Sequence, residues 1–274
     1  MGANTRIEWA THTFNPWWGC VKVSEACHHC YAEAWAKRVG QRVWGPRAPR
    51  RTFGDAHWRQ PLTWDRRLSG TGQRERVFCA SMADVFEDRR DLDAHRERLW
   101  GLIEATPNLD WLLLTKRPRV AARLAPYGDD WPANVWLGTT VETQKRAEEN
   151  LPALVAISAR VRFVSAEPLL GPLELGGYLN HLHWLITGGE SGPRARPSSP
   201  SWFRDLRRQC EGADVAFHFK QWGDWAPSEA ERDARRRTEV AMDGTTMARV
   251  GKRLAGRHLD GRAFDGIPSL VEAA

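Results

Sequence analysis

Short apolar runs recur along the chain, and each of them ends in polar residues. They span residues 11–14, 77–80, 111–115, 135–138, 161–165, 184–187 and 215–219. Apolar runs of this length without strict alternation are typical of strands that are buried on both faces of a sheet. The pattern therefore predicts seven strands.

Longer segments with a helical pattern separate several of these runs. They span residues 31–39, 92–105, 143–157 and 201–212, and we expect Thr143 and Ser201 to be N-caps. Strands that alternate with helices indicate parallel βαβ units. We therefore predict an α/β fold, a partial or complete parallel (β/α) barrel of about six to seven strands, with an open doubly wound sheet as the alternative.

The strand–helix pattern ends near Asp224. We expect residues 1–223 to form the barrel, with an insertion at about 38–76, and residues 224–274 to form a small C-terminal extension packed on it. Within this extension, the charged segment 228–238 is predicted to be helical.

Polar residues follow six consecutive predicted strands. They include Ser81, Asp84, Lys116, Glu142, Glu167, Gly188, Gly189, Glu190 and Lys220. In barrels and open α/β sheets alike, ligands bind at the carboxyl ends of the strands. We therefore expect these residues to line a pocket, although any single one of them could be a simple cap.

Positive charge is concentrated in one part of the chain. The net charge is +6, and residues 38–76 hold ten Arg against Asp55, Asp65 and Glu75, a local balance of +7. Aromatic residues are interleaved with these arginines, which is typical of a surface that binds a phosphate backbone and exposed bases. The candidates for nucleic-acid binding are Arg42, Arg47, Arg50, Arg51 and Trp58, and a solvated surface loop is the alternative interpretation.

Cysteine spacing points to a metal site. The chain has five Cys, an odd number that argues against a disulfide framework, and Cys20, Cys27 and Cys30 are spaced C-x6-C-x2-C. Three thiolates suit a [4Fe–4S] cluster with one open iron, or zinc if His12, His28, His29 or His57 adds a fourth ligand. Cys79 and Cys210 lie in apolar surroundings and are expected to be core residues.

Two sequence features concern the location of the protein. No stretch approaches the roughly 18 apolar residues of a membrane span, so no membrane association is expected. The first 14 residues have no apolar signal-peptide core, which favours a cytoplasmic location.

The residues around the cysteines resemble a known pattern. Asn15-Pro16-Trp17-Trp18-Gly19-Cys20, followed by Cys27-His28-His29-Cys30-Tyr31-Ala32, is similar to the N-P-x-x-G-C…C-x-x-C-Y-A pattern of radical S-adenosylmethionine (SAM) proteins related to spore photoproduct lyase. A closer resemblance is to a phage-associated group of three-Cys-motif, radical-SAM-like proteins. It extends over the segments 81–84, 114–118, 165–171, 188–192, 219–223 and 255–261.

This resemblance implies a function. It implies that Cys20, Cys27 and Cys30 ligate a [4Fe–4S] cluster whose fourth iron binds SAM, and that a 5′-deoxyadenosyl radical then removes a hydrogen atom from the substrate. Among the residues at the strand ends, the candidates for cofactor contacts are Ser81, Asp84, Gly188, Gly189 and Glu190, and those for catalysis are Lys116, Glu142, Glu167 and Lys220.

The substrate and partners are also expectations. A nucleic-acid base, modified or repaired, fits both the basic segment and the resemblance. An electron donor such as a flavodoxin or ferredoxin, and a partner protein, are implied as well. Two alternatives stay open: radical-SAM chemistry on a peptide or small metabolite, and a non-enzymatic, zinc-stabilised nucleic-acid-binding protein.

Overall fold

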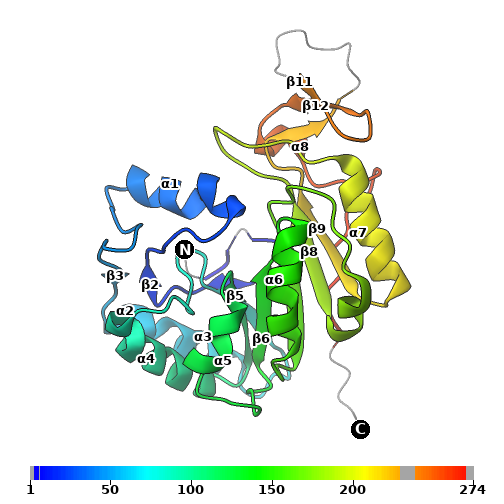
Figure 1. Ribbon diagram of the computed structural model, residues 1–274. Helices are drawn as coiled ribbons and strands as arrows, with labels where there is room; N and C mark the ends of the chain where they lie inside the picture. The colour runs from blue at the N-terminus through cyan, green and yellow to red at the C-terminus, as the bar shows by residue number, and fades with distance from the viewer. Residues whose placement is uncertain (1–2, 6, 229–237, 270–274) are drawn as a thin grey trace. The chain divides into compact units, whose positions relative to one another are not determined.

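Seven parallel strands form one sheet in the computed structural model, which describes residues 3–5, 7–228 and 238–269 (Figure 1). They are β1 (His12–Thr13), β4 (Glu75–Cys79), β5 (Leu109–Thr115), β6 (Val135–Thr140), β7 (Val161–Ala166), β8 (Trp184–Gly188) and β9 (Ala216–Gln221). Each predicted strand is present. Their order in the sheet is β1-β4-β5-β6-β7-β8-β9, which follows the chain and never reverses. A doubly wound sheet requires a reversal, so the fold is the predicted partial barrel, a half-barrel.

Burial explains why apolar and polar residues do not alternate along these strands. All six residues of β6, all five of β8 and six of the seven in β5 are buried. A parallel sheet is covered on both faces, so its strands need apolar side chains in both directions.

All four predicted helices are confirmed. They are α1 (Tyr31–Arg38), α4 (Asp93–Glu104), α6 (Gln144–Val155) and α7 (Pro200–Gly212). Thr143 caps α6, because its Oγ1 accepts a hydrogen bond from the Arg146 amide at 3.4 Å. The prediction of Ser201 as an N-cap was wrong: Ser199 is the N-cap of α7, and the Ser201 amide donates to Asp243 Oδ2. Pro200 occupies the first helical position, where its fixed φ favours the helix start.

The chain divides into two compact units, which are described separately. The first holds residues 1–139 and 153–162, and the second holds residues 140–152 and 163–274. The division passes through β6, α6 and β7. It does not test the predicted barrel and extension, which remain an expectation.

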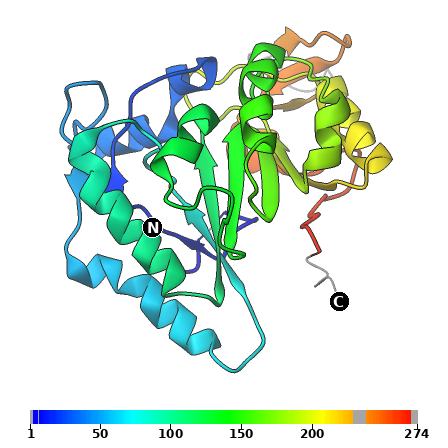
Figure 2. The same cartoon turned by 60° about the horizontal axis from the view of Figure 1, so that its bottom comes forward.

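The first unit contains more regular structure than the sequence predicts. The segment 38–76, interpreted as a loop, holds β3 (Arg51–Thr52), α2 (Asp55–Trp58) and α3 (Gln60–Leu68), and β3 pairs with β2 (Trp17–Trp18) in an antiparallel ladder. Figure 2 shows α2 and α3 as consecutive helices in the light-blue part of the chain. Two aromatic contacts fix them: Trp58 packs edge-on against Phe14, and Trp64 stacks on His12 of β1. The prediction of a loop was wrong because the buried positions of the segment are few and of mixed type: Val43, Arg50, Trp58, Pro61, Trp64 and Leu68. The 3-10 helix η2 (Arg90–Leu92) and α5 (Pro118–Leu124) complete the unit.

In the second unit, α7 packs against β8 and β9. The 3-10 helix η3 (Gly176–His181) precedes β8, and a small antiparallel sheet has the order β10 (Trp225–Pro227), β12 (Thr246–Arg249), β11 (Thr238–Val240), followed by α8 (Lys252–Ala255). The helix predicted over 228–238 falls almost wholly on residues 229–237, which lie outside the described residues. None of the described helices is long and apolar enough to span a bilayer.

Candidate functional site

Three cysteines lie on the segment between β2 and α1, here called the cysteine loop (residues 19–30). Cys20 follows β2 closely, Cys27 lies in the 3-10 helix η1 (Glu25–His29), and Cys30 immediately precedes α1. All three thiols are free and half-buried. By contrast, Cys79 and Cys210 are fully buried, as predicted for core residues.

The cysteine loop begins beside the carboxyl end of β4. The Gly19 amide donates to the Met82 carbonyl at 3.0 Å, and Gly19 forms a parallel bridge with Ala83. Gly19 has a φ of +115°, and a Cβ there would lie 2.3 Å from the Val43 carbonyl oxygen. Only glycine therefore brings the loop to this edge of the sheet.

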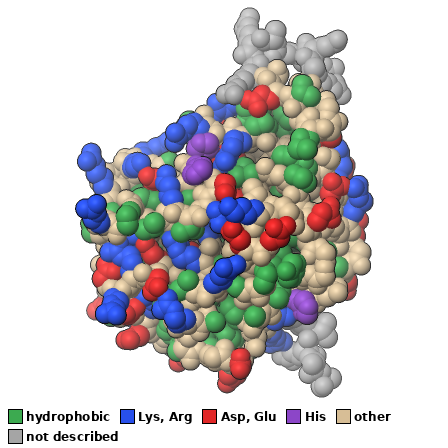
Figure 3. Space-filling model, in the orientation of Figure 1, with side chains coloured by type: hydrophobic (Ala, Val, Ile, Leu, Met, Phe, Trp, Pro, Cys, Tyr) green, Lys and Arg blue, Asp and Glu red, His purple; other side chains and the backbone are tan. Residues whose placement is uncertain are grey.

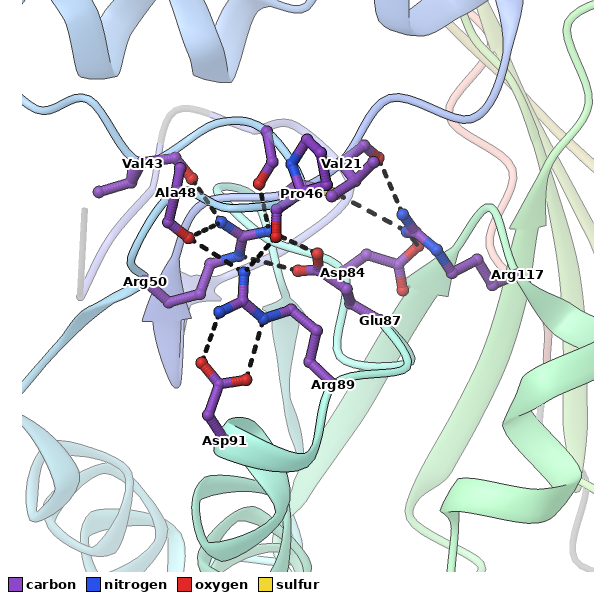
Figure 4. A network of polar contacts seen from close by, with 12 residues as sticks. Val21, Val43, Pro46, Ala48, Arg50, Asp84, Glu87, Arg89, Asp91 and Arg117 are labelled. Carbon is purple, nitrogen blue, oxygen red and sulfur yellow. Dashed lines mark hydrogen bonds and ion pairs between the residues drawn. The ribbon is translucent and has the colours of Figure 1, made fainter.

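Arg117 holds the start of the cysteine loop (Figure 4). Its guanidinium donates to Asp84 Oδ2 at 2.7 Å, to the Val21 carbonyl at 2.8 Å and to Cys20 Sγ at 3.7 Å. Asp84 also accepts from Thr115 Oγ1 and from the backbone amide of Lys116. Burial raises the pKa of the Cys20 thiol to about 12, and the charge of Asp84 adds to this rise while Arg117 opposes it. Arg117 is thus the cation that favours a thiolate at Cys20.

Cys27 and Cys30 lie in a second part of the cysteine loop. Cys27 Sγ is 3.6 Å from Ser24 Oγ. Burial raises the pKa of Cys30, while backbone amides at the start of α1 and the Lys116 ammonium oppose the rise. The predicted residue Lys116 therefore contributes positive charge to the surroundings of Cys30.

The cysteine loop provides the sulfur ligands of a three-thiolate metal site. It consists of three free thiols within 11 residues, with positive charge from Arg117 and Lys116 beside two of them. Across the described residues, however, no three His, Cys, Asp or Glu side chains are gathered closely enough to hold a metal ion. The residue types thus fit a cluster, and the loop would have to draw its three sulfurs together to bind one.

Ser81 and Asp84, both predicted cofactor contacts, lie beside the cysteine loop. The Ser81 hydroxyl is 3.0 Å from Asn15 Nδ2, and Asn15 Oδ1 accepts from the Met82 amide at 2.7 Å. The Tyr31 hydroxyl donates to the Ser81 carbonyl at 2.8 Å. Asn15 and Tyr31 thus tie both ends of the three-cysteine segment to the strand edge after β4.

In the second unit, Glu167 and Lys220 are brought together. Lys220 Nζ lies 2.8 and 2.9 Å from the two Glu167 carboxylate oxygens, and Gln221 Nε2 donates to Glu167 Oε1 at 3.1 Å. Both charged side chains are about 15% exposed. Glu142 is fully buried, and its carbonyl accepts from the Leu170 amide. Glu167 and Lys220 form a partly accessible pair of opposite charge that can bind a polar ligand.

The Gly188-Gly189-Glu190 segment is explained by packing. A Cβ on Gly189 would lie 1.9 Å from the Trp222 carbonyl oxygen, so glycine is required where two backbone segments meet. Glu190 is buried and accepts hydrogen bonds from the Arg196 amide and guanidinium at 2.6–2.8 Å. These contacts give Gly189 and Glu190 structural roles, and their predicted role in cofactor binding stays a prediction, as does that of Gly188.

The predicted nucleic-acid contacts divide into two groups. Arg50 and Trp58 are buried: Arg50 pairs with Glu87 (Figure 4), and Trp58 lies under Arg98, whose guanidinium is 4.6 Å from its ring. Burial makes these two side chains inaccessible to a nucleic acid in this structure. Arg42, Arg47 and Arg51 are exposed, and Arg51 lies over the ring of Trp18.

Comparison with a family model decides the relationship of this chain. The model described as "Protein of unknown function (DUF5131)" matches residues 4–268. The chain belongs to the DUF5131 family. Among curated proteins, none matches its sequence significantly.

Solved structures resemble this DUF5131 protein in fold. A cysteine-to-serine mutant of spore photoproduct lyase matches with a TM-score of 0.50 at 13% identity, covering 93% of this chain and 72% of that chain. A further mutant of that enzyme, with bound AdoMet and dinucleoside spore photoproduct, matches with a TM-score of 0.48 at 13% identity, covering 90% of this chain and 70% of that chain. The first match shows that the DUF5131 fold resembles that of spore photoproduct lyase.

Arg117, Asn15 and Tyr31 contact the cysteine loop or the strand edge beside it, and none of the three is among the site residues predicted from the sequence. Arg117 lies in a Thr-Lys-Arg-Pro segment after β5, and Asn15 opens the Asn-Pro-x-x-Gly-Cys pattern. Arg117 stands next to the predicted residue Lys116, and Asn15 opens the motif that ends in Cys20, which was the available signal. Their roles depend on contacts between distant segments, because 97 residues separate Arg117 from Cys20.

Proposed function

We propose that this protein is an iron–sulfur enzyme of the radical-SAM type that modifies or repairs a nucleic-acid base. Cys20, Cys27 and Cys30 would each ligate one iron of a [4Fe–4S] cluster, leaving the fourth iron open for SAM. The observation that carries the proposal is the set of three free, half-buried thiols on a loop that begins beside the carboxyl end of β4, in a parallel half-barrel. The fold likeness to spore photoproduct lyase supports it.

The residues of the first unit would position and protect the cluster. Arg117 and Asp84 hold the backbone beside Cys20, and the charge of Arg117 offsets that of a thiolate. Asn15 and Tyr31 fix the strand edge at Ser81. When bound, the cluster and SAM together would supply a 5′-deoxyadenosyl radical for hydrogen-atom removal.

Other predicted residues belong to the same proposal. Ser81, Asp84, Gly188, Gly189 and Glu190 stay candidates for holding SAM, and Lys116, Glu142, Glu167 and Lys220 stay candidates for contacts with the substrate. Within this set, the Glu167–Lys220 pair favours a ligand that can replace one partner of an ion pair, such as a carboxylate or phosphate on Lys220. We also propose relatedness to the phage-associated three-Cys-motif proteins, a cytoplasmic location, and electrons supplied by a flavodoxin or ferredoxin.

Product analysis tests the proposed reaction. Protein that has been purified and reconstituted anaerobically is incubated with SAM and dithionite, with and without DNA or RNA, and 5′-deoxyadenosine is measured by chromatography. We expect 5′-deoxyadenosine from the wild type and none from Cys20→Ala, whereas Cys210→Ala, a matched thiol outside the loop, keeps the activity. Absence of the product from reconstituted wild-type protein would contradict the proposal.

A further inference from the structure

The exposed aromatic residues of this protein are confined to one helix face. All 27 Phe, Tyr and Trp residues lie within the described parts of the chain, and two of them are exposed: Tyr31 at 60% and Trp35 at 43%. They are four residues apart in α1, so their side chains share one face of the helix. We call Tyr31 and Trp35 the α1 aromatic face.

Burial on a neighbouring side of α1 holds this face in place. Ala32 and Ala36 are buried in a cluster with Val43 and Met82, against which Trp18 also packs. The Tyr31 hydroxyl is bound to the Ser81 carbonyl, so its ring stays exposed while its end is fixed. The α1 aromatic face is therefore a built surface on a rigid element, and its exposure does not result from a loose helix end.

Charge around the α1 aromatic face is positive. Apart from Arg50, which is buried against Glu87, residues 22–51 hold six Lys and Arg against Glu25 and Glu33, a balance of +4. Glu33 is flanked by Lys22 at 2.7 Å and Lys37 at 2.6 Å, so two cations face this one carboxylate. Arg38, Arg42 and Arg47 are exposed on the same helix and on the segment that follows it. In the space-filling view, Lys and Arg side chains surround hydrophobic ones over this part of the first unit (Figure 3).

We propose that the α1 aromatic face binds a single-stranded segment of nucleic acid. Unpaired bases would stack on the rings of Trp35 and Tyr31, and Arg38, Arg42 and Arg47 would hold the phosphates. Paired bases of a duplex keep their faces covered, so a single strand or an extruded base suits the exposed rings. This inference rests on the proposed function and specifies that the nucleic acid is single-stranded where it contacts the protein.

Binding measurements with defined oligonucleotides test the inference. Fluorescence anisotropy of a labelled 20-mer is recorded as a single strand and as a duplex, for the wild type, Trp35→Ala and Trp35→Phe. A stacked base contributes about 1–3 kcal/mol, so Trp35→Ala should weaken single-strand binding roughly 5- to 150-fold, and Trp35→Phe should restore most of it. Trp202→Ala, a half-buried tryptophan in the second unit, serves as the matched control and should bind normally.

Salt dependence separates the phosphate contacts from the stacking. Arg42→Gln removes one phosphate contact and should reduce the magnitude of the slope of log K against log[salt] by about 1. Trp35→Ala should leave this slope unchanged. Single-strand affinity that is the same in wild type, Trp35→Ala and Arg42→Gln would overturn the inference, as would tighter binding of the duplex. Binding is also measured with the Cys20→Ala protein, which should hold no cluster. If this variant still binds the single strand, nucleic-acid binding does not depend on the cluster, and each proposal can be refuted without the other.

Discussion

Arg50 is predicted to stabilise the fold, in contrast to the nucleic-acid role that its sequence context indicates. Its side chain is 1% exposed, and that of its partner Glu87 is 4% exposed. The guanidinium donates to both Glu87 oxygens, at 3.0 and 2.5 Å, and to the carbonyls of Val43 and Ala48 at 2.9 and 2.8 Å. Replacing Arg50 with Met therefore leaves a carboxylate buried without its cation.

The cost follows from this geometry. Removing one partner of a buried ion pair costs about 3–5 kcal/mol, so Arg50→Met should lower the free energy of unfolding by about 4 kcal/mol. For a chain of this size, that corresponds to a fall in Tm of roughly 8–16 °C. Urea and thermal unfolding followed by circular dichroism measure both quantities.

Two further variants make the test specific. Arg42→Met removes an exposed arginine and should change stability by less than about 0.5 kcal/mol. The double variant Arg50→Met/Glu87→Leu removes both charges and should recover most of the loss. The reasoning is refuted if Arg50→Met unfolds like the wild type and loses nucleic-acid affinity instead.

Three more predictions concern stability. Burial lowers the pKa of His12 below 6.5 and does the same for His57, so the unfolded chain takes up protons that the folded chain does not. The free energy of unfolding should therefore fall as the pH drops from 6.5 to 5, by up to about 1.4 kcal/mol per pH unit for each histidine, and a flat profile in urea titrations would contradict this. Gly189→Ala should cost several kcal/mol or prevent folding because its Cβ would overlap the Trp222 carbonyl, whereas Gly177→Ala has open space and should behave nearly as the wild type; equal Tm values would contradict the packing argument. Arg117→Met should cost about 1–3 kcal/mol, less than Arg50→Met, because Asp84 keeps its bonds from Thr115 and the Lys116 amide; a larger loss in urea titrations would show that this reasoning is incomplete.

The strands could be predicted from the sequence because burial on both faces of the sheet requires continuous apolar runs. The main helices could be predicted from the helical pattern between these runs. Alternation with helices also predicted parallel neighbours, but it left the barrel and the doubly wound sheet as alternatives, and the strand order in the structure decides between them. The segment 38–76 could not be read in this way. Its helix α2 has only four residues and buries Trp58 alone, and α3 buries Pro61, Trp64 and Leu68 at helical spacing over nine residues that begin next to a proline, a signal too short to stand out from the sequence.

The candidate site was predictable only where one residue type carries the chemistry. The spacing of the cysteines is sufficient to single out the three thiols of the loop. Charged residues were harder to assign, because the sequence does not distinguish an arginine that faces solvent from one that pairs with a buried carboxylate. Arg50 and Arg51 are neighbours in the sequence, yet one is buried against Glu87 and the other is exposed over Trp18. Tertiary contacts that the local sequence does not encode make this difference.

The tryptophan content is largely explained by packing. Fourteen of the 15 Trp are buried or half-buried, and several pack in aromatic groups around β1 and α2. Trp35 is the exception, which is why its exposure carries weight in the proposal for the α1 aromatic face.

Iron and sulfide analysis tests the central claim most directly. Wild type, Cys20→Ala and Cys210→Ala proteins are purified without oxygen, reconstituted with iron and sulfide, and analysed for iron, acid-labile sulfide and zinc per chain. The account predicts about four irons and four sulfides in the wild type and in Cys210→Ala, with loss of the cluster in Cys20→Ala. A colourless wild-type protein that holds one zinc and no sulfide after reconstitution would contradict it.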